Sequence, residues 1–284
     1  MGKIVMTVEY LTGDCREVLK KLPEKHFNTV VTSPPYYGLR DYGTEEQFGL
    51  EDTPEAFVKN LVEVFKEIKR VLRDDGTVWL NLGDTYSSNR WSNTPSSTGI
   101  SKFYSDISHK KQTNLEDKNL IGVPWKVAFA LQKDGWYLRQ DVIWHKPNAM
   151  PESVKDRCTK AHEYIFLFSK NKSYYFDNEA IKEEVKHDLN ETKNKRSVWT
   201  VSFEPFKKAH FAVFPTKLIE PCVLAGCPKG GHVLDPFGGS GTTGLVADRF
   251  NRNATLIDLN EDYIEIAKKR IKDDAPLLVG WANE

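Results

Sequence analysis

The stretch that decides the fold is Val233-Leu234-Asp235-Pro236-Phe237-Gly238-Gly239-Ser240-Gly241-Thr242-Thr243. A short apolar strand runs into a glycine-rich turn, and a helix is predicted to start at about Thr242. Glycines let a backbone adopt positive φ and approach a ligand closely, so the turn is typical of a binding loop. Its spacing is not the dinucleotide fingerprint, and no Gly-Lys-Ser/Thr follows, which disfavours a phosphate-cradling P-loop.

An acidic residue follows the next strand of the chain. The strand predicted at 254–257 ends in Ile257-Asp258-Leu259-Asn260. A carboxylate at the end of the second strand of such a unit can accept both hydroxyls of a ribose. Together with the glycine-rich turn, Asp258 therefore indicates a cofactor that carries a nucleoside but no pyrophosphate. The structural alternative is that Asp258 caps the helix predicted at 261–272.

Short apolar runs alternate with helical patterns along the rest of the chain, which is typical of a parallel sheet flanked by helices. Apolar residues at helical spacing predict helices over 54–72 and 123–133. The predicted strands are 28–32, 76–82, 142–144, 164–168, 232–234 and 254–257. Two polar stretches interrupt this alternation, a long loop at 86–119 and a charged segment at 171–210.

Composition argues against several classes of protein. The 284 residues are 39% hydrophobic, which excludes a fibrous or fully disordered chain and suits one large α/β domain. Lys plus Arg and Asp plus Glu are both 40, so bulk charge does not hold this protein on nucleic acid. The charges are nevertheless separated, since residues 193–208 carry five bases and one acid. Four cysteines and no run of about 18 apolar residues predict a reduced, cytoplasmic protein that does not enter the membrane.

The stretch Thr32-Ser33-Pro34-Pro35-Tyr36-Tyr37-Gly38 directly follows the strand predicted at 28–32. Ligands of parallel α/β sheets bind beyond the carboxyl ends of the strands, so this turn lies where chemistry is expected. Two prolines stiffen the turn and leave carbonyl groups free to accept hydrogen bonds. The Ser33 hydroxyl adds an acceptor and the Tyr36 ring adds a stacking face, which suits an amine on a planar ring. An ordinary proline-rich turn is the structural alternative.

The two turns together resemble the motifs of the amino-group DNA methyltransferases, which transfer a methyl group from S-adenosylmethionine to an exocyclic amine of a DNA base. The stretch 235–243 resembles the cofactor motif, and Ser33-Pro34-Pro35-Tyr36 resembles the catalytic motif. The catalytic motif comes first, an order that resembles the circularly permuted β class. The resemblance implies a Rossmann-like α/β fold: a seven-stranded, mostly parallel sheet with helices on both faces, plus a small target-recognition insert.

Further segments fit the same family pattern. Leu11-Thr12-Gly13-Asp14-Cys15 resembles the third strand, whose Asp lies near the cofactor adenine, and 210–218 resembles the segment that covers the methionine part. The segments 144–148 and 162–166 match later strands of the catalytic half. The resemblance implies S-adenosylmethionine as cofactor. It implies these cofactor-binding residues: Asp14, Phe214, Pro215, Thr216, Asp235, Phe237, Gly239, Ser240, Gly241, Thr242, Asp258 and Asn260.

The resemblance gives catalytic roles to Ser33, Pro34, Pro35 and Tyr36. Ser33, the Pro34 carbonyl and Tyr36 are expected to hold a base that has been flipped out of the duplex. Ser at the first motif position is typical of enzymes that act on cytosine N4, whereas Asp or Asn is usual for adenine N6. A hydroxyl can accept from either amine, so its chemistry does not decide between the two bases. The resemblance makes cytosine N4 the favoured target and adenine N6 the alternative.

The resemblance also divides the chain. Residues 1–170, with the loop at 86–119, form the catalytic half; 171–209 form the target-recognition insert; 210–284 form the cofactor-binding half. Double-stranded DNA is the expected partner, while a homodimer and a separately acting restriction endonuclease stay open. The predicted DNA-binding residues are Lys193, Lys195, Arg196, Lys207 and Lys208.

Other classes of site and protein are weighed against this interpretation. The C-x₄-C spacing of Cys222 and Cys227 lies outside the usual zinc-binding pairs, so no metal site is predicted. His145 and His162 could serve as general bases, but a histidine beside a strand is more often structural. A DNA-binding protein that has kept the fold and lost catalysis is the alternative from another class. The intact motif residues argue against that loss.

Overall fold

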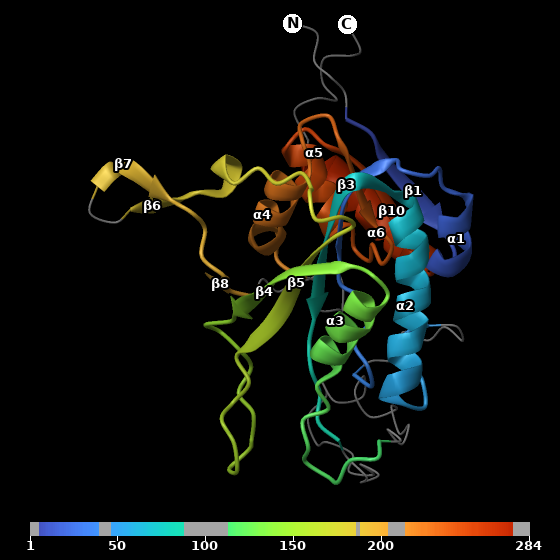
Figure 1. Ribbon diagram of the computed structural model, residues 1–284, viewed down its shortest axis with the longest axis vertical. Helices are drawn as coiled ribbons and strands as arrows, with labels where there is room; N and C mark the ends of the chain where they lie inside the picture. The colour runs from blue at the N-terminus through green and yellow to red at the C-terminus, as the bar shows by residue number, and fades with distance from the viewer. Residues whose placement is uncertain (1–5, 40–46, 88–112, 186–187, 204–213, 275–284) are drawn as a thin grey trace, which may run out of the picture.

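The computed structural model describes residues 6–39, 47–87, 113–185, 188–203 and 214–274. An eight-stranded sheet runs through the molecule in the order β1-β10-β9-β2-β3-β5-β4-β8 (Figure 1). Neighbouring strands from β1 to β3 are parallel, β5 runs antiparallel to β3 and β4, and β8 is parallel to β4. The strands are β1 (Val8–Thr12), β2 (Phe27–Thr32), β3 (Leu72–Leu82), β4 (Tyr137–His145), β5 (His162–Ser169), β8 (Val198–Thr200), β9 (His232–Asp235) and β10 (Asn253–Asp258).

Helices cover both faces of the sheet (Figure 1). One layer consists of α1 (Cys15–Lys21), α2 (Pro54–Val71) and α3 (Val123–Lys133). The other consists of α4 (Thr216–Gly226), α5 (Thr242–Arg249) and α6 (Glu261–Asp274). The helices predicted at 54–72 and 123–133 are confirmed, the first of them capped by Thr53, whose hydroxyl accepts from the backbone of Ala56 at 3.1 Å.

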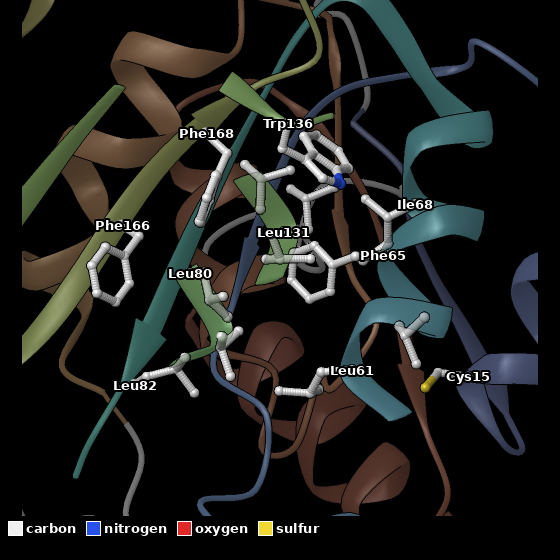
Figure 2. Close-up of a cluster of buried hydrophobic side chains, with 14 of the residues drawn as sticks. Cys15, Leu61, Phe65, Ile68, Leu80, Leu82, Leu131, Trp136, Phe166 and Phe168 are labelled. Carbon is white, nitrogen blue, oxygen red and sulfur yellow. The ribbon is translucent and has the colours of Figure 1, made fainter. Parts of the chain in front are cut away.

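The core divides between the two faces because successive residues of a strand point in opposite directions. On β3, Val78 packs among α1 to α3 whereas Trp79 packs against α4. Figure 2 shows the first cluster, in which Leu61, Phe65 and Ile68 of α2 lie opposite side chains of β3 and β5. Full burial of each such side chain contributes about 1.5–3 kcal/mol, so this layer fixes the strands whose ends carry the motifs.

The prediction of seven strands is wrong, because β8 extends the sheet at the β4 edge. Trp199 of β8 is buried, and its ring lies 6.1 Å from that of Trp79. Its indole nitrogen donates to the Arg196 carbonyl at 2.7 Å. The strand has only three residues and lies in a basic, polar segment. Three residues are too few for an alternating pattern to be recognised, so the sequence does not predict β8.

Two other elements lie in the charged segment. A 3₁₀ turn, η2 (Glu179–Ile181), precedes a separate two-stranded sheet of β6 (Glu183–Val185) and β7 (Asp188–Lys193), which stands apart from the main sheet (Figure 1). The predicted loop at 86–119 is described only at its ends, which pair through Ser87 and Asn119 at 2.8 Å. Its residues 88–112, and Lys207 and Lys208, lie outside the described residues. Within the described ranges, no helix is long and apolar enough to cross a membrane.

Candidate active site

The two predicted motifs lie on neighbouring strands. β2 leads into Ser33 and pairs with β9, which leads into the glycine-rich turn. The Thr32 hydroxyl donates to Asp235 Oδ1 at 2.6 Å and so ties the two strand ends together. β10 and β1 follow on the other side, where Asp258 is the register partner of Thr12. The sheet therefore brings the ends of four strands with predicted site residues to one edge.

The glycine-rich turn depends on residues without a side chain. Gly239 and Gly241 have φ values of +49° and +79°, in the left-handed region that favours glycine. A Cβ at Gly241 would lie 2.6 Å from the Cβ of Ala267, so α6 packs directly on the turn. A Cβ at Gly239 would instead point into open space, with its nearest atom 4.0 Å away. Gly239 thus leaves a cradle that a side chain would fill.

Asp258 closes the cradle from the neighbouring strand. Its Oδ2 accepts from the backbone of Gly239 at 2.8 Å and its Oδ1 accepts from the backbone of Asn260 at 2.9 Å. Burial raises the pKa of this carboxyl above its ordinary value. Asn260, rather than Asp258, accepts from the backbone of Asp262 in the first turn of α6. Each Asp258 oxygen retains a lone pair for a ligand hydroxyl, so the cradle and its carboxylate fit the predicted nucleoside cofactor.

Asp235 lies beneath the turn, only 2% exposed. Besides Thr32, it accepts from the Thr243 hydroxyl at 2.6 Å and from the backbone of Phe237 at 3.1 Å. Burial raises the pKa of Asp235 from 3.8 to about 6. Protein donors thus surround the carboxylate, and the structure makes it a brace between the two motifs.

This brace predicts a pH dependence of stability. The folded protein holds the Asp235 proton more tightly than the unfolded chain does, so the residue's contribution to the free energy of unfolding falls as pH rises from 3.8 towards about 6. Asparagine does not titrate, so the Asp235→Asn variant lacks this loss of stability. From pH 5 to pH 7, we therefore expect the free energy of unfolding of the wild type to fall by about 1 kcal/mol relative to that of Asp235→Asn. Urea unfolding of both proteins at the two pH values measures this change. Asp141→Asn, the same substitution at an exposed position of β4, is the control. If the free energies of unfolding of wild type and Asp235→Asn changed equally with pH, the raised pKa of Asp235 would be contradicted.

The other predicted cofactor residues take several positions. Asp14 caps α1 and binds Arg16; although burial opposes it, the hydrogen bonds from Arg16 lower the pKa of this carboxyl. The Phe237 ring packs edge-on against Phe48 at 5.3 Å. Arg270 of α6 donates to the hydroxyls of Ser240 and Thr242 at 3.1 and 2.8 Å, a contact that sequence reasoning missed. Phe214, Pro215 and Thr216 lie at the start of α4.

The Ser33 turn is held by side chains from β3 and β5. Ser33 Oγ lies 3.3 Å from Asn81 Oδ1 and 3.4 Å from the Tyr36 hydroxyl. The Tyr36 hydroxyl donates to Glu163 Oε2 at 2.7 Å, and Glu163 forms an ion pair with Lys146. Sequence reasoning did not single out Asn81, Glu163 or Lys146, although the last two lie in segments that match the family pattern.

Three of the predicted DNA-binding residues are described by the structure, and they lie in and after the two-stranded sheet. Lys193 ends β7 and is exposed. Lys195 and Arg196 both pair with Glu183 of β6, at 3.8 and 3.0 Å. The Lys195 ammonium also lies 5.2 Å from the centre of the Trp199 ring, so this basic segment packs against β8.

The chain matches the N6/N4 DNA methylase family over residues 27–269. It is 50% identical to the type II methyltransferase M.SmaI of Serratia marcescens, over 92% of this chain and 89% of that protein. It is 49% identical to the type II methyltransferase M.Cfr9I of Citrobacter freundii, over 92% and 87%.

Solved structures share the fold. The PvuII DNA methyltransferase, described as cytosine-N4-specific, superposes with a TM-score of 0.70 at 21% identity, covering 94% of this chain and 90% of that one. A putative DNA modification methylase of Thermus thermophilus, TTHA0409, solved with S-adenosyl-L-methionine, gives 0.63 at 25% identity, covering 95% and 96%. The chain belongs to the N6/N4 family of DNA methylases, and S-adenosylmethionine is its cofactor.

Proposed function

We propose that this enzyme methylates the exocyclic N4 of cytosine at a specific site of double-stranded DNA, by direct transfer to a base flipped out of the duplex. The observation that carries the proposal is the 2.6 Å hydrogen bond from Thr32 to Asp235, which fixes the Ser33 turn beside the glycine-rich turn. An amine held at Ser33 would therefore lie next to the cofactor cradle. Adenine N6 is the alternative target.

In this proposal the chain's own residues orient and activate the amine. Ser33 Oγ and the Pro34 carbonyl accept from its N–H groups, Pro35 stiffens the turn, and the Tyr36 ring stacks on the base. The cofactor, when bound, supplies an electrophilic methyl group on a sulfonium. An exocyclic amine is a poor nucleophile because its lone pair is delocalised into the ring. Acceptors fixed before the base arrives favour the pyramidal amine, whose lone pair is free to attack.

The cofactor assignments follow from the edge of the sheet. We assign the ribose hydroxyls to Asp258, the adenine to the surroundings of Asp14 and Phe237, and the methionine part to residues 214–216. The backbone of the turn at Gly239 supplies the close approach that a nucleoside needs. Asp235 supports cofactor binding indirectly, by holding the glycine-rich turn in place through its hydrogen bonds with Phe237 and Thr243.

The target base and the biological setting rest on separate observations. Serine at the first position of the catalytic motif, which the family resemblance associates with cytosine N4, favours that target. The type II methyltransferases that are about half identical to this chain support methylation of one short sequence, with a restriction endonuclease acting separately as partner.

Base-resolved modification mapping tests the proposal. DNA is isolated from a methylation-free host that expresses the chain, and every methylated base is located. N4-methylcytosine in one short sequence supports the proposal, and N6-methyladenine moves the target to the alternative. Unmodified DNA in the presence of folded, cofactor-binding protein would contradict both and support the DNA-binding protein that has lost catalysis.

We assign DNA recognition to the segment 171–209. Because Lys195 and Arg196 already pair with Glu183, the exposed Lys193 offers the simplest test. Lys193→Ala should lose one phosphate contact. We therefore expect weaker DNA binding and a slope of log affinity against log salt that is smaller in magnitude by about 1. Fluorescence anisotropy over a salt series measures the slope, with Lys268→Ala on α6 as control. An unchanged slope would remove Lys193 from the DNA interface.

A further inference from the structure

A network of polar side chains from β3, β5 and the turn after β2 includes Ser33. Asn81 of β3 is 4% exposed, and the Glu163 side chain of β5 is 14% exposed. Besides its contact with Ser33, Asn81 Oδ1 lies 3.0 Å from the Tyr36 hydroxyl. Asn81 Nδ2 donates to the Tyr164 carbonyl at 3.0 Å and to Glu163 Oε2 at 3.3 Å. The network therefore links Glu163 to Ser33 by way of Tyr36 and Asn81.

The donors and acceptors in this network fix the direction of each hydrogen bond. A carboxylate only accepts and a phenol has one proton, so Tyr36 directs that proton to Glu163 at 2.7 Å in preference to Asn81 at 3.0 Å. The two Asn81 N–H groups are directed at carbonyl and carboxylate oxygens, so Oδ1 faces Ser33. The Ser33 proton then has two acceptors, Asn81 Oδ1 at 3.3 Å and the Tyr36 oxygen at 3.4 Å.

Both ends of the network are held in place. Lys146 pairs with Glu163 Oε1, and its ammonium lies 4.1 Å from the centre of the Trp144 ring. A Cβ at Gly83 would lie 2.6 Å from Cε2 of Tyr36, so glycine at the end of β3 leaves the room that this ring occupies. The carboxylate and the ring are thus fixed from opposite sides.

We propose that Glu163 is a positioning residue for methyl transfer. By accepting from Tyr36 and Asn81, it turns the Tyr36 proton away from Ser33, so that Asn81 Oδ1 and the Tyr36 oxygen accept the Ser33 proton and the Ser33 lone pairs are left to accept from the substrate amine. This inference rests on the role proposed above for Ser33. A hydroxyl can donate or accept. The inference adds that Glu163 is the group that makes the Ser33 hydroxyl accept from the substrate.

The test is Glu163→Gln. Lys146 only donates, so it selects the glutamine oxygen and turns the glutamine NH₂ group towards Tyr36 and Asn81. The Tyr36 proton then turns to Asn81 Oδ1, where it competes with the Ser33 proton, or to Ser33 Oγ, where it occupies a lone pair that the substrate amine needs. We expect kcat on DNA from a methylation-free host to fall at least about tenfold, with KM and Kd for S-adenosylmethionine within about twofold. Glu152→Gln, which breaks the ion pair with Arg157 in the β4–β5 connection, is the matched control and keeps wild-type kcat.

A double-mutant cycle separates positioning from a general structural role. If Glu163 acts through Ser33, Glu163→Gln lowers kcat no further in a Ser33→Ala background. Multiplied effects, or a wild-type kcat for Glu163→Gln, would overturn the proposal. If the glutamine variant does not fold, Asn81→Ala removes the nearer acceptor of the Ser33 proton and must give the same loss and the same cycle. Full activity of Ser33→Ala alone would instead overturn the proposed function, so the two failures are distinguishable.

Discussion

Ser33→Ala is expected to lower the rate of methyl transfer by about two orders of magnitude while the affinity for S-adenosylmethionine stays within about twofold. The substitution removes one preorganised acceptor of the substrate amine. It leaves the Thr32–Asp235 hydrogen bond and the glycine-rich turn intact, because neither involves the Ser33 side chain. Tritium transfer to DNA under single-turnover conditions measures the rate, and equilibrium binding of labelled cofactor measures the affinity.

The control for this substitution is Ser173→Ala, the same change at an exposed serine after β5. It should keep the wild-type rate. Thermal unfolding verifies that both variants fold. If Ser33→Ala transferred methyl groups at the wild-type rate, Ser33 would lose its assigned role. If it lost rate and cofactor binding together, Ser33 would belong to the cofactor site instead.

The sequence predicts most of the sheet because its strands are buried on both faces. The run 164–168 is hydrophobic throughout, and 28–32 combines two valines with two β-branched threonines; each lies within an observed strand. The edge strand β8 escapes this pattern. Its neighbours are charged, and it gains its place through the burial of Trp199 against a strand more than a hundred residues earlier.

In the candidate site, too, some features follow from local sequence and others depend on tertiary contacts. Asp14, Ser33 and Gly239 follow strands and Asp258 ends one, so strand order alone brings them to one edge. The partners of Ser33 depend on register instead: Asn81 and Glu163 meet because β3 and β5 run antiparallel with Asn81 opposite Ile165. No spacing along the chain encodes that register. The depth of Asp235 beneath the turn likewise depends on Thr32 and Thr243, which are far apart in sequence.

Gly239→Val is expected to reduce the affinity for S-adenosylmethionine at least about a hundredfold. The glycine has φ of +49°, and the space beside it is open. A valine would place three carbons in that cradle, where the cofactor must approach the backbone. The left-handed conformation also costs a β-branched residue about 1–3 kcal/mol, so part of any loss of function could come from reduced stability. Isothermal titration of the purified protein with the cofactor measures the affinity directly.

Gly230→Val separates the two effects. Gly230 also has positive φ, +75°, and a Cβ there meets no atom within 4 Å. It precedes β9, whereas Gly239 follows it, so the two glycines lie at opposite ends of the same strand. Gly230→Val should carry a similar conformational cost and keep the wild-type cofactor affinity. Equal loss of affinity in both variants would attribute the effect to strain, and normal affinity of Gly239→Val would remove the cradle from the cofactor site. Because strain is matched, a selective loss in Gly239→Val assigns the open space beside Gly239 to the cofactor.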